Sequence, residues 1–316
     1  MAGIAASAAG LSQLLKKEDE EPARKVRFDS RGVMFVEGNK FLPIVMYGLP
    51  GNPIKYESWK RAKEVGINTI TMFFPKEKAL DFADSLGLKT INRLDYAFGP
   101  NFIPNKDTLE RIQRHKSAVA WEVDEPLRYW SPYSRKPNGG FQGDDLISFL
   151  EWMKTRSELP LRVTTYGPAK SLEIPETRLV LEKIYGAYPN IISGPDVYES
   201  GARVRKEVSS YVDYWHEQVK AGRSEVKTVW QVTSAHSEDE ELFGRSLSYE
   251  DMVDQALSGM LAGAKGLGFY DSPWGCDLDD CQVAEEDNGR INAFGKHLGK
   301  IERTIKTLRP LMHLLA

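Results

Sequence analysis

The sequence predicts a (β/α)8 barrel, in which eight parallel strands, each followed by a helix, close into a ring. Short apolar runs alternate eight times with stretches of helical periodicity between residues 41 and 308. Several helical stretches end in a glycine shortly before the next apolar run, namely Gly66, Gly87, Gly222 and Gly263. Acidic and aromatic side chains gather where the apolar runs end, which is the face of a barrel that carries its chemistry.

Each strand is expected where β-branched and aromatic residues cluster between turn residues: 41–47, 68–74, 88–94, 117–123, 161–166, 190–193, 227–233 and 266–270. Each helix is expected where apolar residues recur every three or four positions: 56–65, 76–86, 107–115, 144–156, 176–185, 202–221, 249–262 and 288–308. Residues 26–28 and 33–36 alternate around a turn and predict a hairpin that caps the bottom of the barrel. An open, doubly wound sheet is the alternative, but residues 48–53 lack its GxGxxG pattern.

The chain is expected to form one domain over residues 26–316, preceded by a flexible segment or linker over residues 1–25. Residues 1–15 are uncharged and rich in alanine but lack the basic start of a secretion signal. A trimmed signal, a weak membrane-facing helix and a flexible tail all stay open. Elsewhere no run approaches the roughly 20 apolar residues that cross a bilayer, so stable membrane insertion is not expected. A secreted or periplasmic location is favoured over a cytoplasmic one, and the oligomeric state is left open.

The composition excludes some classes of function. A net charge of -3 and the lack of a basic stripe argue against nucleic-acid binding. The chain has 7 Trp, 13 Tyr and 13 Phe, enough for a large core and for some surfaces on which a sugar could stack. Cys276 and Cys281 are expected to form either a loop disulfide or two free thiols. A zinc site is less expected, because a cysteine pair at this spacing is a weak zinc signal. Because the 5 histidines show no ligand spacing at a strand end, neither a metal nor a cofactor is expected.

The carboxyl ends of the predicted strands carry a set of polar and aromatic side chains. Acids there suit glycoside cleavage, in which one carboxylic acid protonates the leaving oxygen and a second carboxylate attacks the sugar or activates water. The opposite strand ends, which include Leu42, Asn68, Lys89, Ala118, Arg162 and Lys227, show no such pattern. The residues expected at the active face are Tyr47, Arg93, Asp124, Glu125, Tyr166, Asp196, Tyr198, Gln231, His236, Asp271 and Trp274.

The end of the fourth predicted strand, Trp121-Glu122-Val123-Asp124-Glu125-Pro126, resembles a motif of the (β/α)8 glycoside hydrolases that include cellulases and β-galactosidases. In that clan an Asn-Glu pair, often followed by proline, ends this strand. The resemblance implies a carbohydrate substrate, with Glu125 as general acid/base and Asp124 where the asparagine holds the sugar 2-hydroxyl. Residues 35–44 and the aromatic end of the eighth strand, with Trp274, also fit this clan.

The sequence departs from the clan at the seventh strand, where a glutamate nucleophile is usual. Gln231 and His236 stand there instead, so Asp196, Asp271 and Glu238 are all candidates for the second carboxylate. A partner acid across the barrel would suit an inverting mechanism. A non-catalytic, carbohydrate-binding barrel is the alternative function, and a metal-dependent hydrolase is disfavoured by the lack of histidine ligands.

Three further features have two interpretations each. Arg93 and Asp95 form either a substrate-positioning pair or an ion pair at the barrel rim, and the rim pair is favoured. His236 is either a general base or a surface histidine. The aromatic loop 129–134 is either a substrate platform or a loop folded onto its own barrel. Helix residues 211–216 are expected to pack against the barrel.

Overall fold

The structure is a computed structural model, and it describes residues 25–47, 56–73, 75–166, 174–196, 201–222, 226–234, 248–270 and 287–315. Within these ranges none of the helices is both long and apolar enough to cross a membrane. Asp271, Tyr198, His236, Trp274, Glu238 and both cysteines lie outside the described residues, so their predicted roles keep the status of predictions.

Parallel strands close into a ring with eight positions, which confirms the predicted barrel. The first six positions are β4 (Ile44–Tyr47), β5 (Thr69–Met72), β6 (Lys89–Arg93), β7 (Ala118–Asp124), β8 (Leu161–Tyr166) and β9 (Ile191–Asp196). Two short strands, β10 (Val226–Val229) and β11 (Gln231–Ser234), share the seventh position, because both pair with β9. The eighth strand, β12 (Leu267–Tyr270), pairs with β11 on one side and with β4 on the other, which closes the ring.

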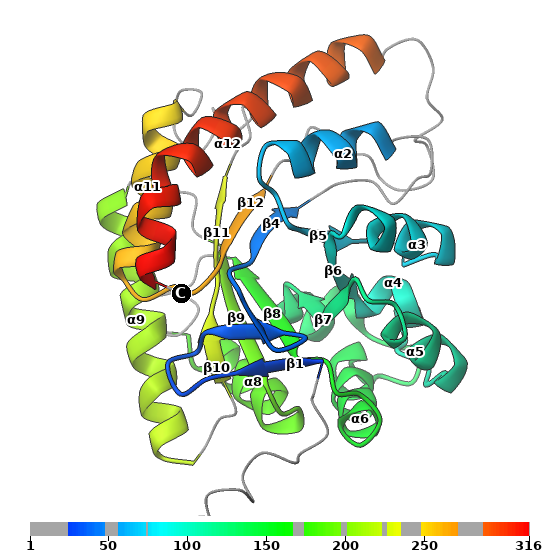
Figure 1. The fold of residues 1–316 in the computed structure, drawn as a ribbon. Coiled ribbons are helices and arrows are strands. Elements are labelled where there is room, and N and C mark those ends of the chain that lie inside the picture. Colours follow the sequence, from blue (N-terminus) through cyan, green and yellow to red (C-terminus); the bar gives the residue numbers. More distant parts are fainter. Residues whose placement is uncertain are drawn as a thin grey trace, which may run out of the picture.

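Helices surround the ring of strands (Figure 1). They are α2 (Tyr56–Glu64), α3 (Glu77–Leu86), α4 (Leu94–Phe98), α5 (Lys106–Gln113), α6 (Gln142–Lys154), α8 (Pro175–Ala187), α9 (Gly201–Lys220), α11 (Tyr249–Leu261) and α12 (Asp287–Leu315). Every predicted helix is present, and most ends agree within two residues. Two differences stand out. The short helix α4 begins where the third strand was expected to continue, and α12 runs through Pro310, past its expected end.

The predicted hairpin is part of a three-stranded antiparallel sheet: β1 (Val26–Phe28), β2 (Met34–Val36) and β3 (Asn39–Phe41). Residues 37–40 were expected to form a turn and Phe41 to begin the first barrel strand, whereas residues 39–41 form β3 of this sheet. The sheet lies at the amino ends of the barrel strands, as predicted. There the Lys25 ammonium donates to the His115 carbonyl just before β7, and Glu37 Oε2 lies 3.9 Å from Lys89 Nζ at the start of β6.

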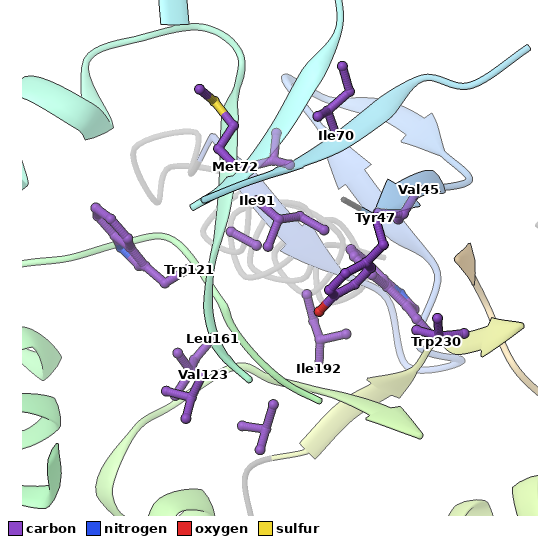
Figure 2. Packing of buried hydrophobic residues seen from close by; sticks show 14 of the residues in the cluster. Val45, Tyr47, Ile70, Met72, Ile91, Trp121, Val123, Leu161, Ile192 and Trp230 are labelled. Atoms are coloured by element: carbon purple, nitrogen blue, oxygen red, sulfur yellow. The ribbon is translucent and has the colours of Figure 1, made fainter. Parts of the chain in front are cut away.

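Side chains of the barrel strands alternate between its interior and the surrounding helices, since successive residues of a strand point to opposite faces. Pairing places Arg93, Glu122 and Arg162 side by side on β6, β7 and β8, all facing inward. In Figure 2, Tyr47 and Ile91 point toward the middle of the ring, whereas Trp121 points away from it. The odd-numbered neighbours on β7 therefore fill the core under the helices, and the even-numbered ones, up to Asp124, line the interior.

Candidate active site

A polar cluster fills the barrel interior below the carboxyl ends of the strands. Its members are Tyr47 on β4, Glu122 on β7, and Arg162 and Thr164 on β8, each at most 2% exposed. Glu122 Oε1 accepts hydrogen bonds from Arg162 Nη1 and Thr164 Oγ1, both at 2.9 Å, and from the Tyr47 hydroxyl. The guanidinium carbon of Arg162 also stands 4.8 Å from the centre of the Tyr47 ring. Three strands are thus joined through one buried carboxylate.

The environment shifts the pKa values in this cluster in known directions. Burial raises the pKa of Glu122, and the Arg162 cation opposes that shift. Burial also raises the pKa of the Tyr47 hydroxyl well above its usual value, so Tyr47 stays a hydrogen-bond donor at neutral pH. The cluster is thus buried beneath the strand ends, and the substrate-binding role of Tyr47 stays a prediction.

Above this cluster, Arg93 organises the rim of the barrel on the side of β6 and β7. Its Nη1 donates to Asp124 Oδ2 at 2.6 Å, and its Nε and Nη2 donate to the two oxygens of Asp95 at 3.2 and 2.9 Å. Arg128 Nη2 adds a second cation at 2.6 Å from Asp95 Oδ2. The guanidinium carbon of Arg93 lies 4.8 and 4.9 Å from the ring centres of Phe73 and Tyr96, which pack edge-on against each other at 5.6 Å.

These contacts confirm the predicted pair of Arg93 and Asp95 and place it at the rim. Arg93 is 3% exposed and uses all three of its nitrogens on carboxylates. A direct role in substrate binding is therefore less well supported for Arg93 than a role in fixing Asp124, whose carboxylate it orients toward the barrel mouth.

Glu125 follows Asp124 at the carboxyl end of β7 in a strained backbone conformation. Its φ of 44° and ψ of 60° are left-handed, a region that non-glycine residues seldom occupy. The Glu125 amide donates to the Thr164 carbonyl at 3.0 Å, and its own carbonyl accepts from the Arg128 amide at 3.0 Å. These two bonds hold the turn, and Pro126 then starts a 3-10 helix, η2 (Pro126–Trp130).

The electrostatic surroundings of Glu125 favour its protonated form. The residue as a whole is exposed, but partial burial of its carboxyl group raises the pKa, and the neighbouring Asp124 charge raises it further. Arg128 and Arg93 act in the opposite direction. The structure thus brings together two adjacent carboxyl groups in different environments, one tied to a buried arginine and one with a raised pKa.

Asp196 ends β9 and is 7% exposed. Its position pairs with Tyr166 on β8 and Val232 on β11, which places it on the inward-facing side of the ring at the carboxyl end. Its charge raises the pKa values of both Tyr47 and Arg162, so the three groups share one environment. Tyr166 lies beside it in the sheet, although the structure describes the backbone of Tyr166 alone.

Gln231 corrects one sequence-based expectation. It was expected to face the barrel mouth, but its amide packs against α11, where a Cβ atom built on Gly259 would lie 1.5 Å from Gln231 Oε1. The side chain therefore points outward, because alternation along β11 sends Gln231 and Val232 to opposite faces.

The aromatic loop after β7 folds largely onto its own barrel. Tyr129 is 4% exposed, and its ring packs edge-on against Phe102 at 5.1 Å. Trp130 covers Gly143 of α6, where a Cβ atom would meet the indole ring at 1.9 Å. Tyr133, at 98% exposed, is left free of this packing. Helix α9 likewise packs inward through Tyr211 and Trp215, as predicted.

Sequence reasoning missed Glu122 and Arg162. Arg162 was placed among the unremarkable amino ends of the strands, and Glu122 was treated only as part of a motif. Alternation along the strands gives the missing signal, because residues two apart point to the same face. Glu122 therefore faces the same side as Asp124, and Arg162 the same side as Thr164. Two opposite charges at inward positions of adjacent strands indicate a buried ion pair.

Comparisons with known proteins add little to this picture. No protein-family model matches the chain, and no curated protein is similar to it in sequence. Solved structures with a similar fold include a GH18 chitinase from Pseudoalteromonas aurantia, at 11% identity over 81% of this chain and 99% of that one, with a TM-score of 0.46. A GH128 endo-β-1,3-glucanase from Amycolatopsis mediterranei shows 8% identity over 72% and 86% of the two chains and a TM-score of 0.45.

The dihydropteroate synthase of Yersinia pestis matches about as well, with 11% identity over 90% of this chain and all of that one, and a TM-score of 0.43. Hydrolases and an unrelated synthase thus stand at the same level of similarity. At these values the matches carry no argument about function, and the barrel itself rests on the strand pairing described above.

Proposed function

We propose that the protein is a glycosidase in which Glu125 is the general acid and Asp124 is a binding carboxylate beside it. The observation that supports this best is the strained backbone of Glu125. A non-glycine residue with left-handed dihedral angles costs on the order of 1–3 kcal/mol and persists where the surroundings impose it, which is typical of functional sites. Here the strain holds a carboxyl group with a raised pKa at the active face of the barrel.

The two adjacent carboxyl groups are suited to different roles. A general acid must carry a proton near the working pH, and the raised pKa of Glu125 favours that state. Asp124 accepts a 2.6 Å hydrogen bond from the buried Arg93 cation, which holds its carboxyl group in place. Asp124 can accept a hydrogen bond from a sugar hydroxyl, and its charge contributes to the raised pKa of Glu125.

The second catalytic carboxylate in this proposal is Asp196 or Asp271. Of these two, the structure describes Asp196, which ends β9 and is separated from β7 by one strand, β8. Because neighbouring strands lie about 4.8 Å apart, the ends of β7 and β9 are roughly 9–10 Å apart. If the two carboxyl groups themselves stand roughly 6.5–9.5 Å apart, they leave room for a water molecule and the reaction is inverting.

A panel of aryl glycosides with different sugars and leaving groups tests the proposal. We expect Glu125→Gln to lower kcat/KM about 10²–10⁴-fold for poor leaving groups such as 4-methoxyphenol. The loss should be much smaller for 2,4-dinitrophenol, which departs without a proton. Glu110→Gln on α5, an exposed glutamate paired with Lys106, is the matched control and should leave activity unchanged.

Two results would count against the assignment. If Glu125→Gln lowered the rate equally for all leaving groups, Glu125 would not be the acid. Binding of the same sugars by the wild-type protein without any turnover would favour the carbohydrate-binding alternative. The Glu125 pKa gives a second test, because Asp124→Asn should lower it in a ¹³C NMR titration of the carboxyl group by removing the adjacent charge.

A further inference from the structure

A second cluster of charged groups lies on the outer side of the barrel, away from the strand ends just described. Glu77, Asp81 and Asp84 follow one another at intervals of four and three residues on α3, so they occupy one face of that helix. His115, which follows α5 and precedes β7, faces them. Ligand atoms of Glu77, Asp81 and His115 all lie within 4.8 Å of one another.

The imidazole of His115 is buried and fixed at one of its nitrogens. The side chain is 5% exposed, and Nδ1 lies 3.1 Å from Asp84 Oδ2 and 3.8 Å from Asp81 Oδ1. Because an ionised carboxylate only accepts hydrogen bonds, we assign a proton to Nδ1, and Nε2 is the buried ring nitrogen on the side of Glu77. Asp84 is itself held in place, since its other oxygen accepts a hydrogen bond from the Ser117 amide at 2.5 Å.

His115 Nε2 points into the acidic cluster without making a hydrogen bond to any described residue. The nearest group is Glu77 Oε1, at 3.4 Å. A cation bound between these two atoms would be a ligand partner for both of them. Glu77 Oε2 is a second buried atom here without a hydrogen-bond partner among the described residues.

The separation of 3.4 Å is the one expected between two ligands of a single tetrahedral metal ion. With zinc–ligand distances of about 2.0–2.1 Å and a tetrahedral angle, a nitrogen and an oxygen ligand stand roughly 3.4 Å apart. A histidine that donates its other ring nitrogen to a carboxylate is also the usual arrangement for a zinc ligand, because the carboxylate fixes the tautomer and the ring orientation.

We propose that His115 Nε2, Glu77 and Asp81 bind a zinc ion on the outer side of the barrel, with water completing the coordination and Asp84 orienting the imidazole. One imidazole and two carboxylates favour zinc over magnesium or calcium, which prefer oxygen ligands throughout. The ion would join α3 to the segment that leads into β7, where Lys25 of the N-terminal sheet also contacts the His115 carbonyl. Its role would be structural, since these residues lie on helices and at the amino end of a strand.

Two arginines compete with the ion for Glu77. Arg114 Nη2 lies 2.5 Å from Glu77 Oε1, and Arg111 Nη1 lies 3.6 Å from Oε2. The Arg114 side chain is 64% exposed, so it can leave Glu77 for solvent when zinc binds. Removing Arg114 should therefore tighten zinc binding, whereas removing the carboxylates should weaken it. A site that bound zinc through other parts of the chain would respond to neither change.

Isothermal titration calorimetry of the full chain, stripped with EDTA, tests this proposal with zinc chloride, with magnesium chloride as the comparison. We expect Glu77→Gln and Asp81→Asn each to weaken zinc binding about tenfold or more, and Arg114→Ala to strengthen it. All three side chains are at least 40% exposed, so the variants should fold. Asp107→Asn, an exposed acid on α5, is the matched control and should leave the affinity unchanged.

Cobalt gives an independent readout, because tetrahedral Co²⁺ with a nitrogen ligand absorbs strongly in the visible range. We expect that absorption in the wild-type protein and its loss in the Asp81→Asn variant. The proposal is overturned if zinc does not bind, or if Glu77→Gln and Asp81→Asn bind zinc as tightly as the wild-type chain and the Asp107→Asn control.

Discussion

The buried pair of Glu122 and Arg162 allows a stability prediction that needs no substrate. In Glu122→Leu, the fully buried Arg162 cation loses its carboxylate partner, and the Tyr47 and Thr164 hydroxyls lose an acceptor. The hydroxyls keep each other, since their oxygens lie 2.9 Å apart. The dominant loss is then the uncompensated cation, and we expect the free energy of unfolding to fall by about 3–5 kcal/mol.

The reciprocal change should be milder. In Arg162→Met, Glu122 keeps both hydroxyl donors and can take up a proton, because burial already raises its pKa. We expect a loss of about 1–3 kcal/mol. In the double variant Glu122→Leu/Arg162→Met, neither charge is left, so the free energy of unfolding should return to within about 1 kcal/mol of the wild type.

Urea unfolding followed by circular dichroism, carried out on all four proteins, measures the coupling between the two sites. The values above correspond to a coupling of at least about 3 kcal/mol. If the double variant lost the sum of the two single losses, to within about 0.5 kcal/mol, the two side chains would be independent. The description of the barrel interior as one joined cluster would then be refuted.

Three further predictions concern packing, capping and pH. Gly259→Ala should destabilise the protein by about 1–3 kcal/mol in urea unfolding because its Cβ would overlap Gln231, whereas Gly186→Ala in α8, with open space around it, should be neutral or stabilising. Ser248→Ala removes the capping box of α11 and should lower the unfolding free energy by about 1 kcal/mol, with Ser210→Ala on α9 as the control. Burial lowers the pKa of Lys25 from 10.5 to about 8. Between pH 8 and 10.5 the unfolded chain therefore binds more protons at Lys25 than the folded chain does. The free energy of unfolding should then rise with pH across this range. In Lys25→Gln, urea unfolding at several pH values should show a smaller rise.

Much of the fold could be predicted because its signals are local. Apolar runs of strand length and helical periodicity both act over a few residues, and they gave the eight barrel positions in order. The exceptions lie where the chain changes direction. Residues 94–98 are apolar enough to continue a strand, but they form α4 and send Leu94 and Phe98 into the core under the helices.

The candidate site was predicted less completely, because it depends on contacts between strands. Asp124 and Glu125 stand beside a proline and could be identified from the chain alone. Arg162 could not, since it meets Glu122 only through the register in which β7 and β8 pair, and that register is not visible in the sequence.

The N-terminal sheet has a consequence for how the molecule folds. It touches the amino ends of β6 and β7 through Glu37 and Lys25, and it also meets the start of β10, where a Cβ atom on Gly32 would lie 2.7 Å from the Lys227 carbonyl oxygen. Two of these contacts, at Lys89 on β6 and at Lys227 on β10, lie nearly 140 residues apart in the chain. Since contacts between such distant segments form only after a large loss of chain entropy, β1 to β3, which precede the barrel in the chain, are expected to be among the last strands to dock. In a hydrogen-exchange experiment during refolding, the amide protons of β1 to β3 would then become protected only after the barrel has closed.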